Sequence, residues 1–159
     1  MKFTIKGISF RQYEIYDSNN VPLGMLNYPS WMTYRKATIT CAGKTYDLAP
    51  AGIFSRQVVI SESGNRIGAV AMKGFSGIHI SIDGGANYLV KRVGFFNSHM
   101  GLFTENKQEI AKATLANKWA FRRLTYNIET DDNYTEGKEL LLLLLIIYCT
   151  NTLRAAHAT

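Results

Sequence analysis

The basic side chains of this sequence are the residues best suited to chemistry, because several of them come in adjacent pairs. Guanidinium and ammonium groups bind phosphate through charge-assisted hydrogen bonds, which makes such pairs candidates for holding an anionic ligand. Two of the pairs follow a tryptophan by three or four residues, at Trp31 and Trp119. The candidate anion-binding residues are Arg35, Lys36, Lys91, Arg92, Arg122 and Arg123. The alternative interpretation is a set of solvated charges that keeps the protein soluble.

No motif predicts a catalytic nucleophile. The segment Gly74-Phe75-Ser76-Gly77 lacks the spacing of a nucleophile elbow and is expected to form a tight hairpin turn. Cys41 alternates with Ala37 and Ile39, which predicts a small buried hydrophobic residue rather than half of a Cys–His pair. We therefore expect a protein that is not an enzyme.

Metal sites and cofactors are not predicted either. The three histidines have no cysteine partners at ligand spacing. One acidic cluster, Asp131-Asp132-Asn133 with Glu136 and Glu139, lacks the loop spacing and central glycine of an EF-hand. We expect it to form a solvated turn before a helix, whose N-terminus favours negative charge.

Nucleic acid is not an expected partner. Lys73-Gly74-Phe75 matches the first residues of an RNA-recognition signature. However, Gly77 and Ile80 stand where that signature has aromatic residues that stack on bases.

A run of ten apolar residues dominates the C-terminal part of the chain: six leucines, Leu140 to Leu145, continue into Ile146, Ile147, Tyr148 and Cys149. A bilayer core of about 30 Å needs roughly 20 apolar residues, so no membrane span is expected. The absence of glycine and proline predicts a helix over about 138–157. Because this helix is apolar on every face, it must be buried on every face. The alternative is a membrane anchor that lies outside the folded domain.

The preceding segment, about 2–136, alternates like a series of strands joined by hairpins. In Gly77–Asp83, three isoleucines at every second position predict a strand with one buried face. Similar units recur: Trp31, Phe75 and Trp119 are each 44 residues apart, and Gly24, Gly68 and Ala111 have nearly the same spacing. Also, Gly52-Ile53-Phe54 recurs as Gly94-Phe95-Phe96. The sequence therefore predicts three repeats of about four strands.

About twelve antiparallel strands form a sheet large enough to close into a barrel, and such a barrel is wide enough to hold a helix about 10 Å across. We predict a single domain over residues 1–159. Its fold class is an all-β barrel with one α-helix: about twelve antiparallel strands, in three four-stranded repeats, closed around the hydrophobic C-terminal helix.

A turn with an acidic residue, an aliphatic–glycine pair such as Leu23-Gly24 or Ile67-Gly68, three such units and a C-terminal hydrophobic helix together resemble the tubby C-terminal-like superfamily. The resemblance covers roughly Arg11 to His157. Its members include tubby, the plant LURP-one-related proteins and the phospholipid scramblases. It implies a twelve-stranded barrel around a central helix, and a connection to lipids through phosphoinositide binding or lipid translocation. No binding residue of the family can be matched to a position of this chain.

Composition agrees with a globular domain: 159 residues are 47% hydrophobic, and the formal net charge is +6. The N-terminus has no secretory pattern and the two cysteines form no framework, which predicts a cytoplasmic protein, peripheral to a membrane if it binds lipid. The expected function is a non-enzymatic binding module for anionic lipid headgroups such as phosphoinositides. The alternative is a structural or protein-interaction domain with no small ligand.

Overall fold

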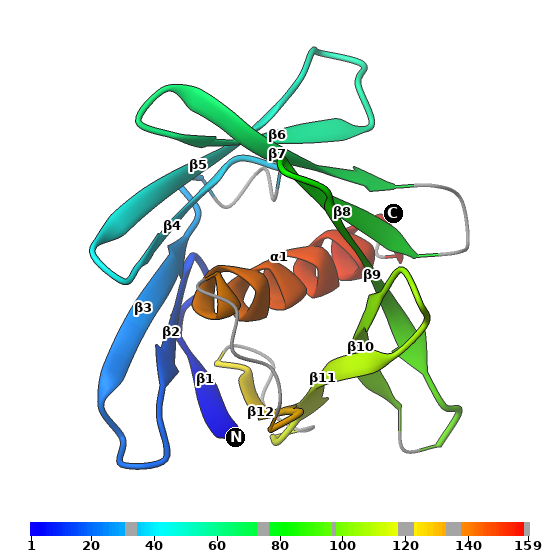
Figure 1. The fold of residues 1–159 in the computed structure, drawn as a ribbon. Coiled ribbons are helices and arrows are strands. Elements are labelled where there is room, and N and C mark those ends of the chain that lie inside the picture. Colours follow the sequence, from blue (N-terminus) through cyan, green and yellow to red (C-terminus); the bar gives the residue numbers. More distant parts are fainter. Residues whose placement is uncertain (31–34, 73–76, 97, 118–122, 133–137, 158–159) are drawn as a thin grey trace.

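The protein is a closed β-barrel that surrounds a single helix, as Figure 1 shows. The computed structural model describes residues 1–30, 35–72, 77–96, 98–117, 123–132 and 138–157. The elements follow one another as β1 (Lys2–Ser9), β2 (Gln12–Tyr16), β3 (Pro22–Asn27), β4 (Ala37–Cys41), β5 (Lys44–Pro50), β6 (Gln57–Glu62), β7 (Asn65–Met72), β8 (Ile78–Ile82), β9 (Ala86–Val93), β10 (His99–Thr104), β11 (Glu109–Leu115), β12 (Thr125–Thr130) and α1 (Glu139–His157).

Every strand pairs antiparallel with its neighbours in the sequence, and β1 closes the barrel on β12 from Lys2↔Glu129 to Lys6↔Thr125. The barrel therefore has two distinct ends. We call the end that carries the β1–β2, β3–β4, β5–β6, β7–β8, β9–β10 and β11–β12 connections the helix-C end, because the last turns of α1 contact it through Arg154 and Tyr126. The opposite end, from which the chain enters α1, is the helix-N end.

The threefold repeat is confirmed. Strands β1–β4, β5–β8 and β9–β12 form three equivalent units, and each unit has a register shift in the pairing of its second and third strands. The shifts follow Ile15, Ile60 and Leu102, which are all fully buried. A β-bulge adds local twist, so its recurrence helps each unit curve by the same amount toward closure. The aromatic positions Trp31, Phe75 and Trp119 lie outside the described residues.

The core is the interface between the strands and the helix. Ile78 and Ile80 are fully buried and Ile82 is 6% exposed, as the alternation predicts. In α1, every side chain from Leu141 to Cys149 is at most 1% exposed, so the helix is buried on all faces. The last described strand ends at Thr130 and the helix begins at Glu139; positions 133–136 of the predicted strand region lie outside the described residues. Among the described helical residues, no stretch is long and apolar enough to cross a membrane.

Polar contacts anchor the helix at its C-terminal half. The Tyr148 hydroxyl donates to the Arg35 carbonyl at 2.8 Å, and Asn151 Nδ2 donates to the Tyr28 hydroxyl at 3.1 Å. The Tyr28 and Tyr148 rings stack with their centroids 6.3 Å apart. Because these bonds are directional and satisfy buried polar groups, they fix the depth and rotation of the helix within the barrel.

Candidate functional site

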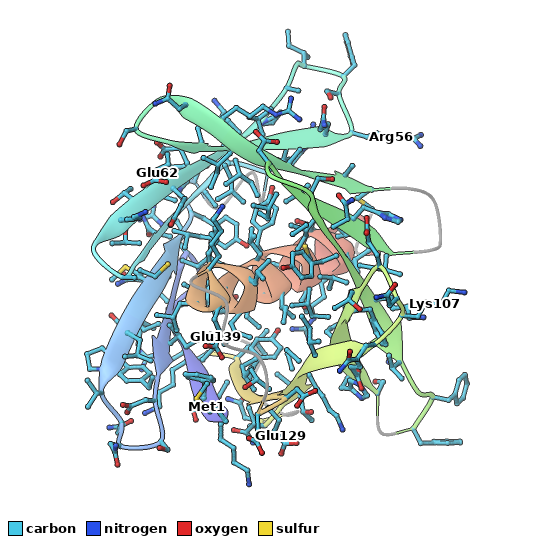
Figure 2. All side chains as sticks on the ribbon, viewed as in Figure 1. Met1, Arg56, Glu62, Lys107, Glu129 and Glu139 are labelled. Carbon is cyan, nitrogen blue, oxygen red and sulfur yellow. The ribbon has the colours of Figure 1, made fainter. Side chains whose placement is uncertain are left out.

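Charge is distributed unequally between the two ends of the barrel. In the described connections of the helix-C end there are five basic residues and no acidic residue: Arg11, Arg35, Lys36, Arg56 and Arg123. The described connections of the helix-N end carry five acidic and two basic residues: Asp17, Asp83, Glu105, Asp131, Asp132, Lys107 and Lys138. The difference in charge between the two ends can be followed along β6 in Figure 2, where the basic Arg56 precedes the strand and the acidic Glu62 ends it. The helix-C end is therefore the electropositive end.

A cleft of about 300 Å³ opens at the helix-C end, between the wall formed by β9–β12 and the last turns of α1. Its walls are mixed apolar and polar, as is typical of a small-ligand site. The lining residues are Arg92, Ser98, His99, Met100, Ala113, Leu115, Tyr126, Thr150, Leu153 and Arg154. Among the residues that the structure describes, two arginines and no carboxylate line this cleft.

Each of the two arginines is held by a neutral partner. Arg92 Nη2 donates to Ser98 Oγ at 3.0 Å, and Arg154 Nη1 donates to the Tyr126 hydroxyl at 3.1 Å. In the part of the chain that the structure describes, neither guanidinium forms an ion pair with a carboxylate. A guanidinium has five N–H donors, so both side chains keep donors for an anion in the cleft.

Burial raises the pKa of Tyr126, although the neighbouring Arg154 opposes the shift. The phenol therefore stays protonated at neutral pH and adds no negative charge to the cleft.

His99 has an acidic partner of its own. Its Nε2 lies 2.5 Å from Glu109 Oε1, across the β10–β11 pair. His99 lines the cleft, and the Glu109 carboxylate pairs with its imidazole ring rather than with either arginine. The neutral partners of the arginines and the His99–Glu109 pair therefore leave guanidinium donors available to an anion.

The thiols take no part in this site. Cys41 is 4% exposed and Cys149 is fully buried. Burial raises the pKa of Cys41 to about 11 and that of Cys149 still further, so neither forms a reactive thiolate at neutral pH. The predicted buried role of Cys41 is confirmed. Among the described residues, no group of histidine, cysteine, aspartate and glutamate side chains is arranged to hold a metal ion.

The predicted pair Lys91-Arg92 is divided between the two faces of the barrel wall. Arg92 continues the inward alternation of the buried Tyr88 and Val90 and lines the cleft, whereas Lys91 Nζ lies 4.7 Å from the centroid of the Phe103 ring. Lys91 faces a second groove of about 610 Å³ on the outer wall, where Glu105 and Lys107 give mixed charge. Only Arg92 of this pair belongs to the cleft.

The described members of the other predicted pairs, Arg35, Lys36 and Arg123, lie at the same end, in the β3–β4 and β11–β12 connections. The half-buried Arg35 donates through Nη2 to the Ser55 carbonyl, and Lys36 is exposed. Arg123 is exposed, and its carbonyl accepts a hydrogen bond from Asn117 at 2.6 Å. Arg122 lies outside the described residues. The cleft is the cationic feature that the described residues organise at this end.

Sequence reasoning missed Arg154, the second arginine of the cleft. The available signal was its place in the last turn of the predicted helix, where a cation is favoured. Its distance of 62 residues from Arg92 in the sequence hides the pair. Arg154 lines the same cleft as Arg92 because the last turns of α1 lie at the end of the barrel where β9 ends.

Comparison with known proteins supports the architecture. No family model matches the chain, and a search of curated proteins also finds no match. A protein from Arabidopsis thaliana, solved by X-ray crystallography, is similar in structure with a TM-score of 0.59. The two chains are 10% identical, and the match covers 92% of this chain and 89% of the other. The fold is thus a barrel that another protein adopts with a very different sequence.

Proposed function

We propose that this protein is a non-enzymatic binding module for anionic lipid headgroups, and that the cleft at the helix-C end binds the phosphate group. Arg92 and Arg154 supply two guanidinium groups, and Ser98 and Tyr126, which accept hydrogen bonds from them, supply hydroxyl donors. The observation that carries the proposal is that the cleft contains two arginines without a carboxylate partner in the described chain. Guanidinium groups that line one cleft can donate charge-assisted hydrogen bonds to the same anion.

The charge axis of the barrel supports a membrane surface as the source of that anion. A cytoplasmic leaflet rich in anionic lipid attracts basic groups by about 1 kcal/mol for each Lys or Arg near the surface. The basic helix-C end therefore turns toward such a surface, while the acidic helix-N end turns away. The sequence resemblance to the tubby C-terminal-like superfamily, which includes phosphoinositide-binding members, points in the same direction.

The test is co-sedimentation of the full chain with vesicles of phosphatidylcholine alone or with one quarter phosphatidylserine or a few per cent phosphoinositide. We expect binding only to the anionic vesicles and a loss of about tenfold or more in Arg92→Ala with Arg154→Ala. Lys107→Ala with Lys138→Ala removes the same charge from the helix-N end and is the matched control.

Equal losses in the two double variants would show attraction by net charge alone. Absence of binding by the wild-type protein to every anionic vesicle would overturn the proposal, and the alternative of a protein-interaction domain without a small ligand would take its place.

A further inference from the structure

Large apolar side chains are exposed at the helix-C end on three loops. Ile53 and Phe54 in the β5–β6 loop are 89% and 96% exposed, and Phe95 and Phe96 in the β9–β10 loop are 86% and 89% exposed. Phe10 in the β1–β2 loop is 54% exposed. We call these three loops the apolar tips. In the described chain, the helix-N end exposes only Met1 and Val21 among large apolar residues, each at 49%.

The apolar tips are equivalent positions of the threefold repeat. Each tip connects the first and second strands of its unit, so successive tips are separated by four strands around the closed ring of twelve. In Figure 1 the β5–β6 and β9–β10 loops project from separate parts of the barrel. The side chains at the tips have little packing of their own: Phe95 and Phe96 contact each other edge to face, with centroids 5.2 Å apart.

We infer that the three apolar tips insert together into the interfacial region of an anionic bilayer and hold the helix-C end against it. This inference rests on the proposed function and adds a second, apolar component to it. The cleft with Arg92 and Arg154 opens at the same end, beside the β9–β10 tip through Ser98, so insertion presents it to the lipid headgroups.

The separation of the tips favours a bilayer over a protein partner. Three points spaced around a ring define a plane, and a bilayer is planar and accepts insertions at any lateral position. A rigid protein would need three separate pockets at matching positions. A single hydrophobic interface would require the apolar residues to lie in one continuous patch.

The charges beside the tips favour an anionic bilayer in particular. Arg11 follows Phe10 directly, and Arg56 follows Phe54 by two residues. No acidic residue occurs in the described connections of this end, so no carboxylate is forced into the headgroup layer. Aromatic side chains flanked by basic residues are the combination that binds at membrane interfaces.

The experiment measures vesicle partitioning of the full chain on phosphatidylcholine vesicles with one quarter phosphatidylserine, at 0.1 M and 0.5 M NaCl. Phe54→Ser with Phe96→Ser removes one large side chain from each of two tips. Because burial of each phenylalanine contributes about 1.5 kcal/mol or more, we expect the partition coefficient to fall about a hundredfold. Val21→Ser, an exposed apolar residue of the helix-N end, is the control and leaves partitioning unchanged.

A depth measurement gives an independent readout. Phe96→Cys is labelled with an environment-sensitive fluorophore, and the buried Cys41 and Cys149 leave the label at one position. We expect a blue shift on vesicle binding and quenching by lipids that carry a spin label in the acyl chain. The same label at Val21→Cys shows neither change. Circular dichroism and thermal melting of each variant establish that it is folded.

The outcomes separate the two proposals. Binding by the wild-type protein with unchanged partitioning in the tip variant and an unquenched label at position 96 overturns insertion but leaves headgroup binding intact. A wild-type dimer that becomes monomeric in Phe54→Ser with Phe96→Ser also overturns it, because the tips then cover a second copy of the chain. Absence of any vesicle binding refutes the proposed function together with the inference.

Discussion

The burial of α1 on every face predicts an unusual response to mutation at Leu141, Leu142, Leu143 and Leu144. Successive residues of a helix are rotated by about 100°, so these four positions sample most of its circumference. In a helix that covers one side of a domain, some of the four would face solvent and tolerate alanine. Here all four are at most 1% exposed. Each Leu→Ala substitution is therefore expected to lower the free energy of unfolding by about 2–5 kcal/mol.

The assay is equilibrium unfolding in urea, followed by circular dichroism, for the four single variants. Lys112→Ala, an exposed position on β11, is the control and should change stability by no more than about 0.5 kcal/mol. Because a domain of this size has only about 5–15 kcal/mol of stability, an alanine variant that fails to fold is replaced by Ile146→Val, with an expected cost of about 0.5–1.5 kcal/mol. If any of the four leucines proves neutral, part of the helix faces solvent, and the reasoning that places it inside the barrel is refuted.

Three further predictions concern the barrel wall, the thiols and the helix N-terminus. A Cβ at Gly68 would lie 2.3 Å from the Ser81 carbonyl oxygen, so Gly68→Ala should lower the urea midpoint of unfolding. Gly52→Ala is the control, because an added Cβ there would have no neighbour closer than 4.0 Å. Equal midpoints for the two variants would contradict the close approach of the strands at Gly68. Cys41 and Cys149 should react with a thiol reagent at pH 8 only at the rate of unfolding, and rapid reaction in native buffer would count against their burial. Burial raises the pKa of Glu139, so its ionised form opposes folding. The free energy of unfolding of Glu139→Gln, measured in urea, should therefore rise relative to that of the wild-type protein as pH increases from 4 to 7. A difference in free energy between the two proteins that stays flat or shrinks over this range would refute the prediction.

The architecture could be predicted from sequence because two independent patterns require each other. A helix with ten consecutive apolar residues needs an enclosure, and alternating strands with recurring turns provide one. Inward-facing residues such as Ile78 and Ile80 follow from the period of two. The end of β12 at Thr130 did not follow, because the polar sequence after it shows neither alternation nor helical periodicity.

The candidate site could be predicted only in part. Arg92 was identified as one of six basic residues, but its separation from Lys91 depends on which member of the pair faces inward. Arg154 lines the same cleft because of the depth at which the helix sits in the barrel. Hydrogen bonds such as the one from the Tyr148 hydroxyl to the Arg35 carbonyl fix this depth. Two of the three apolar tips were visible as a recurring Gly–apolar–Phe pattern. Hydrophobic residues in a strand-rich sequence are ordinarily assigned to the core, so their exposure required the structure.

The position of the cleft follows from the point at which the side chains of α1 change from apolar to polar. From Leu141 to Cys149 the helix fills the barrel and leaves no room for a ligand, as the near-zero exposure of each side chain shows. At Thr150 and Asn151 the helix becomes polar, and by Arg154 it reaches the mouth of the barrel. The point of change sets the depth of the cleft, because the interior beyond it is occupied by leucine. The buried leucines therefore confine the described cleft to the last turns of the helix, beside Thr150 and Arg154.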